Sequence, residues 1–387
     1  METNDFLGSF AQENVTFQTQ IIKTAVVGDN YWRVMVFVEN DRYISDKTTF
    51  IPVTGSDTIK AATVTSDTFA TVVSGLLQSW LTDLFANGFT GEVILVTIAS
   101  DIPEEDTDEA GKTAFVDALD AAYELLNPYA YWKLVLAGTD EASQAYMAAH
   151  LADLCLKDKD LLSGPVPLPF STSTPETPDS DEWYKACKDK YVFMSAHQDK
   201  TRNAALYSLG LAMAQFNGSG TPIGNSLDMT RSGSITSSGP DGTTLSRSIR
   251  QLLNSLNIQT FKPVGNNTGD VAAEGDKALN GDTIGANWIL CYVSYMVKVS
   301  AAELLTTRNF YKNEANYTRI LGVLQQYLGK FGESGSGRLT AMTVTAPAFD
   351  ALPEAKGDEL IIPNAWEATY VDHLRKVTIT GTLYIGA

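Results

Sequence analysis

Residues 91–100, GEVILVTIAS, form a short apolar stretch that is rich in β-branched side chains. This composition is typical of a strand that is buried on both faces of a sheet. Two similar stretches follow it, YWKLVLAG at 131–138 and KYVFMSAH at 190–197. Patterns of helical period separate and follow these strands, at 109–126, at about 140–156 and at 201–216. Since strands joined through helices lie parallel after right-handed crossovers, the sequence predicts an α/β region with a mainly parallel sheet.

The segments around these strands are predicted to be a hairpin, a helix and a long loop. Residues 15–38, VTFQTQIIKTAVVGDNYWRVMVFV, contain two strand patterns around the turn at 28–30. Residues 66–87 carry apolar side chains at helical spacing, and Gly88 is placed to end that helix. The proline-rich stretch at 164–182, GPVPLPFSTSTPETPDSDE, is predicted to be an exposed excursion between the second and third strands.

A segment rich in Gly, Ser and Thr, at 217–245, separates the α/β region from the second part of the chain. The elements predicted there are an amphipathic helix at 244–257, a short strand in IQTFKPV (258–264), a loop at 266–282, paired helices at 285–305 and 313–331, and strands at 339–346 and 375–385. A strand pattern therefore lies near each end of the chain.

The sequence as a whole predicts an α/β fold that is α+β overall. A mainly parallel α/β sheet domain is followed by an α+β C-terminal domain with a helix pair, and extended strand arms lie at both termini. The predicted divisions are an N-terminal arm with strands at 1–40, an α/β domain at 41–216, a connection at 217–245, a C-terminal domain at 246–374 and a C-terminal strand arm at 375–387.

The charge of the chain is distributed unevenly. The 387 residues carry a formal net charge of −18, with 31 acidic and 13 basic residues in 1–200 against 15 of each in 201–387. Because an acidic surface repels phosphate groups, and the balanced second half offers no broad basic field, nucleic acid is not expected as a partner.

Cysteines and apolar runs exclude several further classes. The three cysteines, Cys155, Cys187 and Cys291, have no C-x-x-C spacing, so neither a disulfide framework nor a thiolate zinc site is predicted. The first residues, METNDFLGSF, lack a basic segment followed by an apolar core, and no continuous apolar run is long enough to span a bilayer. We therefore expect a protein made in a cytoplasm that does not insert into membranes, and no cofactor or metal.

An enzyme or nucleotide-binding protein is the alternative that the parallel sheet keeps open. Such folds bind ligands beyond the C-terminal ends of their strands, which here lie near Ser100, Gly138 and His197. The turns at these ends contain no G-x-G-x-x-G, and the chain has no H-E-x-x-H or G-x-S-x-G. The acidic run at 101–111 lacks the spacing of a calcium loop and is explained by acidic residues favouring a helix start.

The paired helices combine an apolar stripe with basic positions. Aromatic and aliphatic residues recur at intervals of three and four, which predicts that these stripes are core. The basic positions are Lys298, Arg308, Lys312, Arg319 and Lys330. These side chains form either a solvated face or a surface for an acidic partner, and the spacing does not distinguish the two.

The order of segments from about residue 200 onward resembles the tail sheath proteins of contractile phage tails and related injection systems. The resemblance rests on AQFNGSGTPIGNSLDMTRSGSIT (214–236), SIRQLLNSLNIQTFKPVGN (248–266) and GDKALNGDTIGANW (275–288), followed by the helix pair and a final strand. It implies a non-enzymatic subunit that polymerises helically around an inner tube and contracts. The implied partners are further copies of the chain, the inner tail tube protein, and baseplate and tail-terminator proteins, in a virion tail assembled in the host bacterial cytoplasm.

In that family the terminal arms extend to neighbouring subunits and complete a sheet there by strand addition. Carried over to this chain, the subunit-linking strands would contain Ile21, Val26, Val34, Val36, Val377, Ile379, Leu383 and Ile385. The family places its tube contact in the C-terminal domain, where the five basic positions of the helix pair are the expected tube-facing residues. Because only one α/β region precedes that domain, outer decoration domains are expected to be small or missing.

Overall fold

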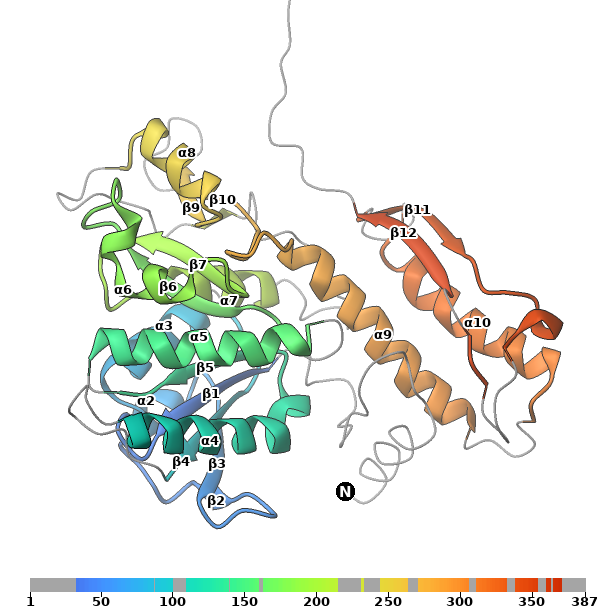
Figure 1. Ribbon diagram of the computed structural model, residues 1–387, viewed down its shortest axis with the longest axis horizontal. Helices are drawn as coiled ribbons and strands as arrows, with labels where there is room; N and C mark the ends of the chain where they lie inside the picture. The colour runs from blue at the N-terminus through green and yellow to red at the C-terminus, as the bar shows by residue number, and fades with distance from the viewer. Residues whose placement is uncertain are drawn as a thin grey trace, which may run out of the picture.

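The computed structural model describes residues 33–86, 88–99, 109–138, 140–159, 163–214, 231–232, 244–263, 271–305, 311–332, 338–353, 360–362 and 365–370. Within these ranges helices and strands alternate through the first half of the chain, and a helix pair with a small sheet closes the second half (Figure 1). The fold class predicted from the sequence, α/β in the first part and α+β overall, is confirmed.

A five-stranded sheet in the order β2-β3-β4-β1-β5 forms the base of the α/β part. Its strands are β1 (Val34–Glu39), β2 (Ile51–Pro52), β3 (Ile59–Val64), β4 (Val93–Ile98) and β5 (Trp132–Leu136). The central strand β1 is parallel to both β4 and β5, whereas β3 and then β2 are added antiparallel at one edge. Every residue of β1, β4 and β5 is buried, which agrees with the apolar composition of these strands.

The strand β1 lies within the range predicted as an N-terminal arm, 1–40, but it does not extend away from the fold. It forms the middle of the sheet, with β4 on one side and β5 on the other. Five of the six residues in VMVFVE are apolar, and burial on both faces is where such a strand is stable. The first strand of the predicted hairpin lies outside the described residues.

The proline-rich stretch at 164–182 corrects a prediction. The sequence predicts an exposed loop, but the first part of the stretch is the buried strand β6 (Val166–Ser171), parallel to β7 (Val192–His197). The backbone N–H groups of Val166 and Thr172 donate to carbonyl oxygens at positions 191 and 197, so the even-numbered N–H groups face β7. Pro167 and Pro169 alternate with them, and their missing N–H groups fall on the opposite side of β6, where no bond to β7 is lost.

The helix predicted at 66–87 is interrupted. It consists of α2 (Phe69–Val72) and α3 (Gly75–Phe85), with Val73 extended and bridged to Ile44. Gly75 has a φ of +59°, a conformation that glycine adopts without strain. The β-branched run TVV at 71–73 favours the extended break over a continuous helix.

Helices cover both sides of the strands (Figure 1). They are α4 (Glu109–Leu126), α5 (Glu141–Lys157), α6 (Glu182–Cys187) and α7 (Ala204–Ala214). In the view of Figure 1, α4 and α5 lie in front of the five-stranded sheet, while α7 packs against α3. Short 3-10 turns occur at Asn127–Tyr129, Pro178–Ser180 and Phe349–Ala351.

A small antiparallel sheet and one helix follow the α/β part. They are β8 (Arg231–Ser232), α8 (Arg247–Ser255), β9 (Thr260–Pro263) and β10 (Val271–Glu274), with the strands in the order β8-β10-β9. The backbone of Gln259 bonds to Met194 and Ala196 of β7, which joins this sheet to the α/β part. The strand β10 corrects the prediction of an unbroken loop at 266–282, whereas the helix at 244–257 and the strand after it are confirmed.

The paired helices are present as α9 (Ile284–Leu305) and α10 (Glu314–Gly329), followed by β11 (Leu339–Val344) and β12 (Trp366–Tyr370). Most buried apolar side chains between β1 and β11 form one large cluster, and a second, small cluster joins α7 to β9 and β10 through Ala204, Tyr207, Phe261, Val271 and Ala273. The helix α9 is long and apolar enough to span a membrane, with a mean hydropathy of 1.3 over its most apolar 18 residues, but 59% of that stretch is buried inside the protein. Its composition is therefore explained by packing. The strand predicted at 375–385 lies outside the described residues.

Candidate assembly interface

The helix α9 connects the α/β part to the C-terminal elements (Figure 1). At its start the Trp288 ring lies 6.3 Å from Tyr131, stacked, and 5.4 Å from Trp132, edge-on. The Cys291 thiol donates to the carbonyl oxygen of Lys159 at 2.7 Å. Further along, the Tyr292 ring meets Phe331 edge-on at 5.8 Å. These contacts fix one helix against two parts of the fold.

The small sheet of β11 and β12 lies beside α10 at the far end from the α/β part (Figure 1). Its inner face is half-buried and packs on the core through Met342, Val344, Trp366, Ala368 and Tyr370. Its outer face is exposed at Thr343, Glu367 and Thr369. Among the described residues each strand pairs only with the other, so no further described strand lies along the outer edge of either one.

The basic positions of the helix pair are only partly described. Lys312 and Arg319 are exposed, one just before the N-cap of α10 and the other on that helix. Lys330 is half-buried, with its ammonium 4.8 Å above the ring of Tyr327. Arg308 lies outside the described residues, and the side chain of Lys298 on α9 is outside them as well. Since eleven residues make about three helical turns, Arg319 and Lys330 lie on one side of α10.

Two of the predicted subunit-linking residues must be reassigned. Val34 and Val36 are fully buried in β1, whose two edges are both occupied by strands of the same chain. A strand paired on both sides has no free backbone groups to offer a neighbour. The remaining linking residues, Ile21, Val26, Val377, Ile379, Leu383 and Ile385, lie outside the described residues, so their role stays a prediction.

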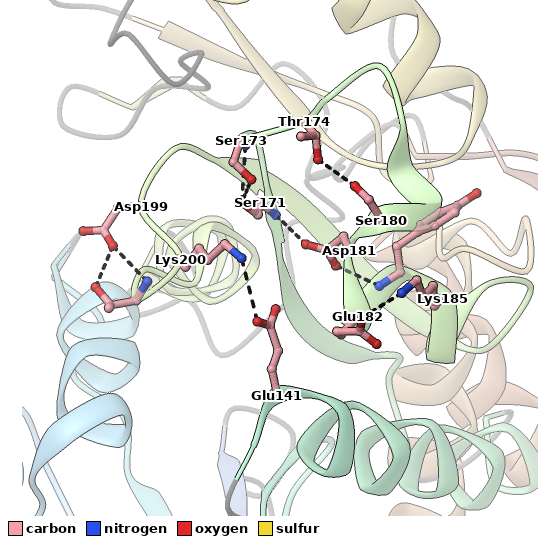
Figure 2. Close-up of polar contacts among 12 residues, drawn as sticks. Glu141, Ser171, Ser173, Thr174, Ser180, Asp181, Glu182, Lys185, Asp199 and Lys200 are labelled. Carbon is pink, nitrogen blue, oxygen red and sulfur yellow. Dashed lines mark hydrogen bonds and ion pairs between the residues drawn. The ribbon is translucent and has the colours of Figure 1, made fainter.

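The end of β7, at His197, is one of the three strand ends where the alternative enzyme site is expected, and together with the end of β6 it forms a rim of polar side chains (Figure 2). The buried carboxylate of Asp181 accepts hydrogen bonds from the backbone N–H groups of Ser171, at 3.1 Å, and Tyr184, at 2.9 Å. Burial raises the pKa of Asp181, and these two hydrogen bonds oppose that rise. Lys200 approaches Glu141 at 3.8 Å across the rim. These contacts hold the 172–181 loop against the start of α6.

The strand-end positions at which the alternative site is predicted, His197 and Gly138, are also held by hydrogen bonds. His197 accepts a hydrogen bond from the backbone N–H of Asp199 at 3.0 Å through Nδ1, and burial lowers the pKa of His197. The N–H of Gly138 donates to the Glu39 carboxylate at 2.9 Å. Ser100 lies outside the described residues. The geometry therefore assigns His197 and Gly138 to loop anchoring. Within the described ranges, no group of three His, Cys, Asp or Glu side chains is placed to hold a metal ion.

Sequence reasoning missed two buried carboxylates that organise this end of the sheet. Asp83 on α3 is fully buried and binds the Arg202 guanidinium and the backbone N–H of Asn203. Burial raises the pKa of Asp83 more than the bonds from Arg202 and Asn203 lower it. Glu39 ends β1 and accepts from Gly138. The sequence does contain one signal for the first of them. Asp83 is an acidic residue within the apolar stripe of a predicted helix, where an apolar side chain is expected.

Comparison with known proteins adds to the description of the fold. No protein family and no curated protein sequence matches the chain. Among solved structures, a chain of the anti-feeding prophage (AFP) baseplate matches with a TM-score of 0.57 at 12% identity, over 96% of this chain and 100% of that one. A chain of the AFP helical sheath in its contracted state matches with a TM-score of 0.56 at 12% identity, over 95% and 98%. Along nearly its whole length, the fold is therefore similar to that of chains from a contractile prophage particle.

Proposed function

We propose that this protein is a structural subunit of a contractile injection machine, and specifically a sheath subunit that polymerises helically around an inner tube and contracts. The observation that supports this most is the fold likeness, which covers nearly the whole of this chain and of a contracted helical sheath chain. Because a chain of the baseplate of the same prophage has a similar TM-score, attachment to a baseplate is part of the proposal.

The subunits would be connected by strand addition at the β11–β12 sheet. In this proposal an extended segment from a neighbour pairs with backbone N–H and C=O groups along an outer edge of this sheet, where the described residues place no further strand. The segments that we propose as donors are the alternating strand at 375–385 and the strand around Ile21 and Val26, each from a neighbouring copy. Main-chain pairing tolerates changes in the angle between subunits, so the copies can stay connected while they rearrange.

The inner tube would meet the exposed side of α10. Lys312 and Arg319 are exposed there, and Arg308, Lys298 and Lys330 are the further basic positions assigned to this contact. Baseplate and tail-terminator proteins would bind the ends of the polymer, and the particle would be assembled in the host bacterial cytoplasm. Energy would be stored in the packing of the polymer and no bound cofactor would be needed.

Removal of residues 377–387 tests the strand-addition proposal. We expect the shortened protein to remain folded, because one continuous core already lies within the described residues, and to lose the ability to form tubes. The measurement is negative-stain electron microscopy of purified protein, with circular dichroism to check folding. The double variant Ile379→Val, Leu383→Val keeps strand propensity and should assemble normally. Long tubes formed by the shortened protein would contradict the proposal.

Charge reversal on α10 tests the proposed tube contact. The variant Lys312→Glu, Arg319→Glu is expected to bind purified inner tubes roughly tenfold more weakly at low salt, with the difference shrinking as salt is added. Lys60→Glu, on the exposed side of β3, is the charge control. Co-sedimentation with tubes measures the binding. If the α10 variant and the control bind equally well, the basic residues are a solvated face.

A further inference from the structure

The outward face of α8 carries a cation whose position the subunit itself does not explain. Its exposed residues are Arg247, Ser248, Gln251, Leu252 and Ser255. Arg250 on the same helix pairs with Glu274 at 3.1 Å, but Arg247 makes no ion pair within the described part of the chain. Arg247 is the first residue after the N-cap Ser246, where the helix dipole disfavours a positive charge. An external carboxylate would remove that cost.

Basic charge also surrounds α8. Lys277, just after β10, is exposed, and Lys262 of β9 joins Arg250 in pairing with Glu274, at 3.2 Å. Glu274 is thus shared by two cations, which leaves the described surface of α8, β9 and β10 with a positive excess. Leu252 is 40% exposed on the α8 face. The face therefore combines one large apolar side chain with positive charge.

The outward face of α4 has the opposite charge and a similar apolar element. Asp117 and Glu124 are exposed, seven residues and thus about 10 Å apart along the helix, and neither forms an ion pair within the described residues. Asp120 between them is occupied by His150 of α5 at 2.6 Å. Leu125 is 39% exposed beside Glu124. Two carboxylates therefore lie on one side of α4, with an exposed leucine beside the second of them.

The two helices lie far apart on the subunit. Figure 1 shows α8 at the top and α4 towards the bottom, in front of the five-stranded sheet. Two surfaces on helices so far apart in one subunit can meet only between copies. Such a head-to-tail contact leaves a free α8 face on one copy and a free α4 face on the other, so it can be repeated to build a ring or an open helical polymer.

We propose that α8 of one copy docks on α4 of the next, with Arg247 between Asp117 and Glu124 and with Leu252 against Leu125. The occupant of each face is thus a second copy of this chain. The nine residues of α8 match the length of the 117–125 stretch of α4. A contact between α8 and an equally short stretch of α4 is small, so it acts only where the terminal strands already hold the copies together. The inference rests on the proposed sheath role and deepens it by naming a second subunit contact.

The test is a charge exchange in the full chain. Arg247→Glu alone, and Asp117→Lys with Glu124→Lys, should each lower the salt concentration at which tubes dissociate, and roughly tenfold more protein should be needed for assembly. The chain that carries all three changes should regain the wild-type behaviour. An equal mixture of the two defective proteins should also assemble, because each supplies the charge that the other lacks. Sedimentation over a series of salt concentrations gives the readout.

The control is Lys157→Glu, an exposed charge reversal on the neighbouring helix α5, and it should assemble as the wild type does. Unchanged assembly of either defective protein, or no recovery in the triple variant, overturns the contact between α8 and α4. If the wild type forms no tubes, the sheath role fails, and equilibrium sedimentation of the mixture still tests the contact. Complex formation by the mixture, and by neither protein alone, then supports it, and its absence overturns it.

Discussion

Replacement of Gly210 by alanine is expected to lower the free energy of unfolding by about 3 kcal/mol or more. Gly210 lies where α7 packs on α3, and a Cβ there would lie 1.9 Å from the carbonyl oxygen of Leu84 and 2.9 Å from its carbon. Both atoms belong to a helix backbone, so neither can turn aside as a flexible side chain would. The helices must separate, and the apolar packing of Leu84 with α7 is then lost.

Gly322→Ala is the matched control. Gly322 is also a helical glycine, and among the described residues no atom outside its own helix backbone lies within 4 Å of the place that a methyl group would take. The substitution should raise stability by about 0.5–1 kcal/mol, since alanine loses less conformational entropy in a helix. Urea unfolding followed by tryptophan fluorescence measures both changes, with the buried Trp80 on α3 as a reporter. Equal stability of the Gly210 variant and the wild type would contradict the close approach of the two helices.

The elements that could be predicted from the sequence are those whose side chains repeat at a clear period. The pattern of apolar residues predicted α4, α5, α9 and α10, and the apolar runs predicted β4, β5 and β7. Where a tertiary contact determines the local structure, the pattern of apolar residues gave the wrong prediction. The strand β6 contains two prolines and is stable because the side without N–H groups faces away from β7. In the sequence, β1 is interpreted as one strand of a local hairpin. Its actual partners, β4 and β5, come more than about fifty residues later in the chain, so no local pattern identifies them.

Part of the candidate interface could also be predicted from the helical period. Exposed basic residues can be recognised on a helix of known period, and Lys312 and Arg319 are indeed exposed. The strand β12, WEATY, alternates apolar and polar residues as a half-buried strand does, but it is only five residues long, so its pairing with β11 is what identifies it. The faces of α4 and α8 required knowledge of which charges are already paired, such as Asp120 with His150, and no sequence pattern contains that information.

A buried lysine makes the stability of this protein depend on pH in an unusual direction. Lys133 on β5 is fully buried, and its ammonium donates to the carbonyl oxygen of Ala130 and to the Ser163 hydroxyl, each at 2.7 Å. The centre of the Tyr123 ring lies 5.3 Å from the ammonium. The titratable groups that act on it from the surrounding helices are Cys155, Asp158 and Cys291. Burial lowers the pKa of Lys133 to about 8.

Because the folded pKa of Lys133 is below the ordinary value of 10.5, the unfolded chain binds this proton more tightly than the folded protein does. Stability contributed by this group should therefore rise with pH between about 8 and 10.5, by roughly 3 kcal/mol in total. Burial raises the pKa of Cys155 from 9.0 to about 11, which acts in the opposite direction as the pH rises through that range. A comparison with a variant that keeps Cys155 is needed to separate the two.

Lys133→Met provides that comparison, since methionine has a similar length and no charge. The free energy of unfolding of the wild type, measured in urea from about pH 7 to about pH 10, should rise relative to that of the variant as Lys133 loses its proton. The burial of Cys155 and Cys187 is common to both proteins, so the part of their pKa shifts that burial causes cancels in the difference, whereas the lowering of the Cys155 pKa by Lys133 is part of the measured effect. Thr63→Val, on the exposed side of β3, should follow the wild type at every pH. A difference that does not change with pH would mean that the folded protein keeps the Lys133 ammonium charged, and that the Tyr123 ring and Ser163 hydroxyl stabilise it more than burial destabilises it.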